Sequence, residues 1–521
     1  MPKPRYFAQR RDLMFAAAYL LLAVLMANCV LWYGVNLGTG ISVGALTLLT
    51  AAYLWPTRRR IGCYGVFCLV GALACAVSFA WSGDSAVKTL TLLLAAVLST
   101  CAVVDMQGLW LRGKDSFRFV GDLCKWSIGY PLGHCGAALW ALFHRQNPDG
   151  SAAGRRTGSV ILGLVCALPV LVVLVPLLMS SDAAFEGLLN RVNFDTLIEL
   201  IVSVILGAGL FLLLFSQGFL LPRYEGPMVK TRQPGRGVGQ VGLGAFLAVI
   251  CALYVLYLAS QLAYFFSGFA GILPEGYTAA EYARRGFFEM TAVCAINLAL
   301  LFVCLLIVRK PEGRAPLSIR LMGLFICLFS LVLITTALSK MGLYINRYGM
   351  TRLRVLTSVF MVFLAVCFVC VSLRLLLRRF GYMQPVLAAG VVLLIALSFA
   401  DCDRFMARYN YAHWQSGQLE ELDVDHLGRL GHGAVPILWE VAQGEDADMA
   451  NKARAYLTMQ GEELLQLTWY DDQTQAELSV PRASARSTDL RAYNRDTTRA
   501  VQILLEHWDD VYIAEYWTWM S

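Results

Sequence analysis

Three ionisable residues between positions 277 and 300 have a spacing that could build a polar site in a membrane helix. Glu281, Arg285 and Glu289 stand at i, i+4 and i+8, so a helix would carry them along one side. Glu289 would lie inside the apolar run that follows, where a carboxylate is costly and needs a partner. The segment fits two interpretations: an outward-opening polar site, or a neutralising ion pair that clamps the helix to its neighbours.

A second segment, residues 340–361, concentrates positive charge in front of another apolar run. Tyr344, Arg347, Thr351 and Arg354 follow one another at roughly one-turn intervals, so a continuous helix would have a basic face. That face could bind a lipid phosphate or a carboxylate, and snorkelling of its side chains to the membrane surface is the alternative. Together the two segments define a candidate outer polar site of Glu281, Arg285, Glu289, Tyr344, Arg347, Arg352 and Arg354.

No recognisable catalytic or metal-binding motif accompanies these residues. His413, His426 and His432 lie near aspartates, but their spacing matches no zinc signature. The glycine-rich stretch 237–244 opens an apolar run and lacks the strand and the Lys-Ser/Thr pair of a phosphate-binding loop. We therefore expect no metal ion, no cofactor and no catalytic residue, which weighs against an enzyme.

The elements that must position the polar residues are membrane helices. The chain is 58% hydrophobic and 15% charged, and its apolar runs are each near the length that crosses hydrocarbon. We predict an all-α fold, a polytopic helical membrane bundle of about eleven transmembrane helices. The predicted spans are 13–35, 37–55, 61–81, 89–108, 160–180, 197–221, 238–266, 286–308, 317–338, 355–377 and 385–400.

The last part of the chain differs from the rest in charge and in pattern. Residues 401–521 contain 21 acidic and 10 basic side chains, and Val501, Leu504, Leu505 and Trp508 follow a helical period. This pattern predicts a small helical soluble C-terminal domain. The predicted organisation is N-terminal transmembrane helices 1–4 (1–111), a cytoplasmic interfacial loop (112–159), transmembrane helices 5–11 (160–400) and an acidic helical extracytoplasmic domain (401–521).

The positive charges before residue 401 predict the orientation. If the N-terminus is cytoplasmic, 25 of these 33 Lys and Arg residues fall in cytoplasmic segments and 8 on the other side. The C-terminal domain is then extracytoplasmic, in a multi-pass protein of the cell membrane. Because the positive charge lies in short loops between apolar runs, it does not indicate a nucleic-acid partner.

The charge separation also predicts contact between the two parts of the chain. The acidic C-terminal domain should dock over the outer ends of the eighth and tenth helices. The expected positive contacts are Arg284, Arg285, Arg347, Arg352 and Arg354. Since exposed ion pairs contribute little, the docking must also bury apolar area, for which Trp414, Trp439 and the leucines of 419–430 are candidates.

Four segments resemble a bacterial multi-pass membrane family catalogued as domain of unknown function four-one-seven-three. They are SSDAAFEGLL (180–189), AEYARRGFFE (280–289), LYINRYGMTRLRVLT (343–357) and DRFMARYNYAHWQSGQLEELDVDHLGRLGHGAVPIL (403–438). The resemblance spans roughly residues 160–440. It implies a bacterial cell membrane and an outward-facing tail that starts at Asp401-Cys402-Asp403, and it brings no established activity or site residue.

These observations favour a binding, sensing or assembly component with an outward-facing polar recognition site. A transporter or lipid-handling protein of the cell envelope is the alternative, and a water-filled cavity at the midplane of the bundle would discriminate it. The expected partners are the lipid bilayer, anionic lipid head groups, and a protein that contacts the C-terminal domain.

Overall fold

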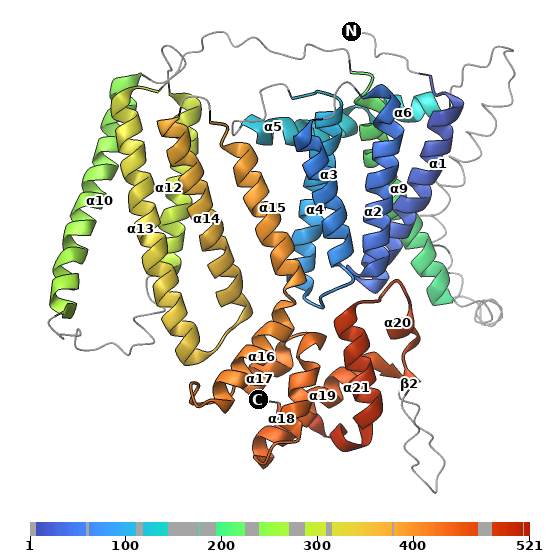
Figure 1. Cartoon of the computed structure of the whole chain (residues 1–521). Helices are drawn as coiled ribbons and strands as arrows, with labels where there is room; N and C mark the ends of the chain where they lie inside the picture. The colour runs from blue at the N-terminus through green and yellow to red at the C-terminus, as the bar shows by residue number, and fades with distance from the viewer. Residues whose placement is uncertain are drawn as a thin grey trace, which may run out of the picture.

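The structure of the chain is a computed structural model. It describes residues 7–58, 62–110, 118–143, 194–224, 239–269, 287–308, 315–377, 380–466, 482–513 and 515–520, together with Leu174 and Leu177. Helices dominate these ranges, and Figure 1 shows an upright bundle with a layer of shorter helices against one of its ends. The predicted all-α polytopic bundle is confirmed.

The first group of helices comes from the N-terminal part of the chain. Short helices α5 and α6 lie across the end of this group that faces away from the C-terminal helices (Figure 1). The elements are α1 (Arg10–Asn28) with η1 (Cys29–Tyr33), α2 (Leu37–Leu54) with η2 (Trp55–Thr57), α3 (Cys63–Ser78), α4 (Ser85–Met106), α5 (Arg118–Cys124), η3 (Lys125–Gly129), α6 (Tyr130–Phe143) and α9 (Phe194–Leu220).

The second group follows it in sequence. It consists of α10 (Gln240–Phe269), α12 (Phe287–Ile307), α13 (Leu317–Tyr348), α14 (Arg352–Leu376) and α15 (Met383–Phe399). Helix α15 is the member of the second group that lies beside α3 and α4 of the first (Figure 1). Thr91 of α4 is 2.6 Å from Ser398 of α15, and a Cβ on Gly390 of α15 would meet Phe363 of α14 at 3.3 Å.

The C-terminal helices form the layer below the bundle in Figure 1. They are α16 (Cys402–Gln415), α17 (Val424–Arg429), η5 (His432–Ala434), α18 (Val435–Ala442), α19 (Ala447–Leu464), α20 (Ala485–Thr488), α21 (Arg495–Val511) and η6 (Tyr516–Trp519). Between α19 and α20, the two-residue strands β1 (Leu465–Gln466) and β2 (Arg482–Ala483) pair antiparallel. This short ladder is an addition to the purely helical tail that the sequence predicted.

Eight helices in the described ranges are long and apolar enough to cross a membrane, or nine if α15 and α16, bent by 64°, count as one span. About eleven were predicted. Apart from Leu174 and Leu177, the predicted span 160–180 lies outside the described residues, and α3 is a shorter apolar helix of 16 residues. The remaining predicted spans each coincide with a helix.

Small residues let the first group of helices pack closely. A Cβ on Gly207 of α9 would lie 2.5 Å from Val24 Cα of α1, and one on Gly40 of α2 would lie 2.3 Å from the Ala76 carbonyl oxygen of α3. Lipid gives helices no hydrophobic reason to associate, so close backbone approach and dispersion hold such bundles together. These glycines therefore fix how α1, α2, α3 and α9 are arranged.

The basic segment before the tenth predicted span is not a continuous helix. Helix α13 ends at Tyr348, Gly349 adopts a φ of 74°, and α14 begins at Arg352. A positive φ at glycine reverses the chain here, so the one-turn spacing of Tyr344, Arg347 and Arg354 does not describe one helical face. The turn between α13 and α14 points toward the C-terminal helices (Figure 1).

The apolar stripe predicted in the tail is the inner side of α21. Val501, Leu504 and Trp508 are 9%, 1% and 2% exposed, whereas Leu505 is 38% exposed. Val501, Leu504 and Trp508 belong to a core that also contains Leu422, Leu427 and Leu430 and includes residues of the bundle. Its buried members from the bundle are Val87 and Leu397, and the partly buried Met350, Val355, Leu356, Val359 and Leu394 pack against this core.

Candidate functional site

Arg352 connects the two helix groups and the C-terminal helices at one point. Its Nε atom lies 3.3 Å from Asp84 Oδ2, and its Nη2 donates a 2.7 Å hydrogen bond to Asp403 Oδ1. Asp84 precedes α4, Arg352 is the first residue of α14, and Asp403 belongs to the first turn of α16. The turn at Gly349 places the arginine here, because α14 begins three residues later.

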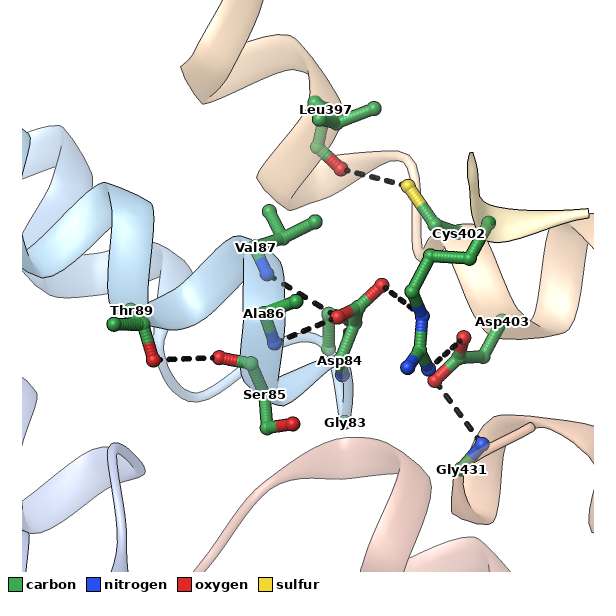
Figure 2. A network of polar contacts seen from close by, with 12 residues as sticks. Gly83, Asp84, Ser85, Ala86, Val87, Thr89, Leu397, Cys402, Asp403 and Gly431 are labelled. Atoms are coloured by element: carbon green, nitrogen blue, oxygen red, sulfur yellow. Dashed lines mark hydrogen bonds and ion pairs between the residues drawn. The ribbon is translucent and has the colours of Figure 1, made fainter. Parts of the chain in front are cut away.

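Both aspartates have further partners and are almost completely shielded from water. Asp84 Oδ1 caps α4 by accepting the amides of Ala86 and Val87, and Asp403 Oδ2 accepts the amide of Gly431 at 3.1 Å. Figure 2 shows Asp84 on one side of this contact network and Asp403, with its bond to Gly431, on the other. The Asp84 and Asp403 side chains are 0% and 1% exposed, against 34% for Arg352. The arginine therefore pairs with two buried carboxylates, and part of its own side chain remains in contact with solvent.

A second ion pair lies beside the first, where α15 turns into α16. Arg495 Nη2 is 3.0 Å from Asp401 Oδ2, and the guanidinium lies 4.3 Å from the ring centroid of Trp81. Asp496 Oδ2 accepts the amide of Gly83 at 2.8 Å, and the Arg495 amide donates to the Ala80 carbonyl. The start of α21 is thus fixed to the 80–84 loop through both backbone and side chains.

Lys88 completes the cluster from inside α4. Its Nζ donates a 2.5 Å hydrogen bond to Asn36 Oδ1, which also accepts from Asn494 Nδ2 at 3.1 Å. Asn494 caps α21 through the Thr497 amide. Ionisable residues within membrane helices are rare and usually paired, and Lys88, 6% exposed, lies near the carboxylates of Asp84, Asp401 and Asp496.

We call these residues the junction cluster: Asn36, Asp84, Lys88, Arg352, Asp401, Asp403, Asn494, Arg495 and Asp496. It contains four aspartates and three basic residues, so one negative charge lacks a basic counterpart within the cluster. Burial raises the pKa of Asp403, and burial together with the Asp401 carboxyl raises the pKa of Asp496 to about 7. Within the described residues, no three histidine, cysteine or acidic side chains are arranged to hold a metal ion.

The residues of the predicted outer polar site are only partly brought together. Arg352 is central to the junction cluster, and Arg354 lies 4.3 Å over the Tyr344 ring while donating to the carbonyls of Tyr348 and Gly349. Arg347 lies 3.9 Å from Glu420, with both side chains largely exposed. Glu281 and Arg285 lie outside the described residues, as does Arg284. Glu289 lies in the first turn of α12, on an exposed position.

Contact between the C-terminal helices and the α13–α14 turn agrees with the predicted docking at the tenth helix, whereas the predicted contacts Arg284 and Arg285 of the eighth helix lie outside the described residues. In addition to the Arg352 and Arg347 contacts, Asn410 accepts the Met350 amide and Tyr409 donates to Asn346 Oδ1 at 3.1 Å. The sequence did not predict the contact of the C-terminal segment with α2 of the first helix group. Backbone amides of Leu37 and Gly38 in α2 donate to the carbonyls of Tyr493 and Arg491, next to the Asn36 contact.

Most of the junction cluster was missed by reasoning from sequence. Lys88 carried a usable signal, because it is a lysine within an apolar run. Asp84 also has the position of a helix cap, directly before such a run. Asp496 and Arg495 carried no comparable signal: they lie in a polar segment, and only the fold brings them to the 80–84 loop.

Comparison with known proteins gives one family match. Neither the curated proteins nor the solved structures contain a match to this chain. The family described as Domain of unknown function (DUF4153) matches residues 42–441, more than half of the chain. The matched range includes Asp84, Arg352, Asp401, Asp403 and Gly431. The resemblance found in the sequence is confirmed, with the catalogue number four-one-five-three in place of four-one-seven-three. The chain belongs to this family of unknown function, as a multi-pass membrane protein whose helices contact the lipid bilayer.

Proposed function

We propose that this protein is a non-enzymatic binding, sensing or assembly component of the bacterial cell membrane. Its cytoplasmic side is the end of the bundle with the N-terminus, and the C-terminal helices lie outside the cytoplasm. The observation that carries the proposal is the bridge made by Arg352 between Asp84 and Asp403. It ties a surface built from C-terminal helices to the ends of both helix groups.

The cost of burying charges supports a role for the junction in fixing one arrangement. Taking ions out of water is expensive, so a buried ion pair contributes less to stability than an apolar contact of similar size, and fixing one geometry is its best-attested use. Apolar contacts of Val87 and Leu397 with the C-terminal core provide attraction at the same place. The C-terminal helices are thus positioned as a platform against the membrane helices.

The charges on the platform side support the proposed orientation. Arg352 pairs with the buried Asp403, Lys88 donates to Asn36, and Arg354 donates to backbone carbonyls. These cations have local structural partners, so their presence outside does not weaken the positive-inside bias of the remaining loops. Because Arg352 and Arg354 are engaged by these partners and only Arg347 is largely exposed, this face favours a protein partner over an anionic lipid.

Reporter fusions test the orientation. A periplasm-active reporter fused after Ser521 should be active, and the same reporter fused after Arg58, at the end of the α2 turn, should be inactive. A cytoplasm-active reporter should give the reverse pattern. Activity of the cytoplasmic reporter after Ser521 would overturn the orientation.

Photo-cross-linking tests the binding function. A photoreactive residue at Glu420, whose side chain is 91% exposed, should give a discrete cross-linked protein in intact cells. The yield should fall in the Arg352→Gln variant, which loosens the platform, and persist in a matched Arg408→Gln variant. Position 256 of α10, which is 68% exposed on an apolar helix, should cross-link to lipid. Cross-linking to lipid alone at position 420, with solute flux in reconstituted vesicles, would favour transport or lipid handling instead.

A further inference from the structure

Asp401 occupies an unusual backbone conformation at the hinge between the bundle and the C-terminal helices. Its φ of 52° is the only positive value at a non-glycine residue among the described residues. It separates α15 from α16, which are bent by 64°. Aspartate and asparagine tolerate this left-handed conformation better than other side chains, but contacts must still stabilise it.

The two oxygens of the Asp401 side chain have different surroundings. Oδ2 accepts from Arg495 at 3.0 Å, whereas Oδ1 is buried and accepts no hydrogen bond from the N–H or O–H groups in the described part of the chain. Gly433 covers it closely, since a Cβ there would lie 3.2 Å from Oδ1. The Asp401 side chain is 6% exposed.

The carboxyl group that interacts with Asp401 is that of Asp496. The two carboxyl groups face the same guanidinium nitrogen, Arg495 Nη2, which lies 3.0 Å from Asp401 Oδ2, and the Asp496 side chain is 2% exposed. Asp496 Oδ2 accepts the Gly83 amide, and Oδ1 lies 3.9 Å from Arg495 Nη2. Two ionised carboxylates that share one cation in a buried site repel each other, and a proton on one of them removes this repulsion and can be donated to the other.

We propose that Asp401 and Asp496 share one proton, and that this carboxylic acid–carboxylate pair is a proton-binding site that closes the junction between the bundle and the C-terminal helices. The pair joins the hinge of α16 to the start of α21. Loss of the proton places two negative charges side by side in a buried site, so it favours opening of the junction. The inference depends on neither the orientation of the chain nor the proposed binding function.

The charges around the pair come from every element packed against it. Lys88 of α4 and Arg495 of α21 face the pair, and the ion pairs of Arg352 of α14 with Asp84, before α4, and Asp403 of α16 lie next to it. His432 of η5 donates to or accepts from Thr497 at 2.9 Å, with Glu463 of α19 among its neighbours. One proton on the pair makes the four aspartates and three basic residues neutral in sum.

The direction of the pH effect follows from linkage. Burial and Asp401 raise the pKa of Asp496 to about 7, whereas an opened, solvated aspartate titrates near its ordinary pKa of about 3.9. The closed state therefore binds more protons between these values, and closing is favoured at low pH and lost as pH rises through 7. Burial lowers the pKa of His432, which acts in the opposite direction below its ordinary pKa of about 6.5.

The test uses the full chain in lipid nanodiscs and the variant Asp496→Asn. Asparagine keeps an acceptor for the Gly83 amide and can donate permanently to Asp401, as the protonated acid would. Hydrogen exchange of α16 and the start of α21 measures opening, after correction for the intrinsic pH dependence of exchange. In the wild type, opening should increase more than about tenfold from pH 5 to 7.5 and level off above it. In Asp496→Asn this rise should be absent, while the contribution of His432 cancels in the comparison.

Asp510→Asn is the matched control, because Asp510 lies in the same helix and is 69% exposed. It should keep the wild-type profile. Infrared difference spectra of the wild type provide a readout that needs no folded variant, since a protonated buried carboxyl gives a C=O band that disappears on raising pH through about 7. Equal pH profiles for the wild type and Asp496→Asn, or absence of that band at pH 5, would overturn the proposal.

Discussion

Replacing Arg352 by glutamine should release the C-terminal helices from the bundle. The substitution leaves Asp84 and Asp403, with side chains 0% and 1% exposed, without the guanidinium that pairs with both. Removing one partner of a fully buried ion pair costs about 3–5 kcal/mol. Because the Arg352 side chain is 34% exposed, water stabilises part of the charge, and we expect about 2–3 kcal/mol.

Hydrogen exchange measures this loss as local opening. If α16 and α17 exchange through separation from the bundle, 2–3 kcal/mol corresponds to exchange that is roughly 30- to 150-fold faster in peptides 402–415 and 424–434. The matched control is Arg347→Gln, which removes an exposed ion pair at 3.9 Å and should cost at most about 1 kcal/mol. Similar, small effects of the two substitutions would refute the role assigned to Arg352.

Two further predictions concern packing and the opposite end of the bundle. Gly461→Ala should destabilise the C-terminal helices by about 1–3 kcal/mol, because its Cβ would lie 2.0 Å from Trp508 Cζ3. Gly342→Ala is the control and should be neutral, because its Cβ meets no atom within 4 Å. Tryptophan fluorescence during thermal unfolding measures both variants, and equal unfolding midpoints would contradict the packing of Gly461 against Trp508. Asp12→Asn should lower the thermal stability of the bundle by about 1–3 kcal/mol, because Asp12 accepts from Tyr53 at 2.7 Å and pairs with Arg223 at 3.0 Å. It should leave exchange in α16 unchanged, and faster exchange there would show that the two ends are coupled.

The membrane helices could be predicted because their signal is local. An apolar run of sufficient length must satisfy its own backbone, so the runs at 13–35 and 317–338 become α1 and α13 without further information. Helix ends were less predictable. The one-turn spacing of residues 344–354 indicated a basic helix, but Gly349, in the polar segment between two apolar runs, ends α13 and reverses the chain there.

The candidate site could be predicted only where its residues lie close in sequence to a membrane helix. Arg352 was expected to meet an anionic group, and it contacts Asp403 as part of the expected acidic tail. The Gly83 contact with Asp496 joins residues 413 positions apart, and no periodicity or composition indicates such a pairing. The Asp401 conformation was equally hidden, because a left-handed aspartate depends on the tertiary contacts that hold it.

A double-mutant cycle between Arg352 and Asp403, in the full chain in lipid nanodiscs, tests most directly whether the junction holds the C-terminal helices on the bundle. Asp403→Asn retains an acceptor for the Gly431 amide and removes only the charge. Exchange of α16 and α17 is measured in the wild type, in each single variant and in the double variant. We expect a coupling free energy of at least about 1 kcal/mol, since the two side chains share a buried contact at 2.7 Å. Additive effects of the two substitutions would contradict a junction held by this ion pair.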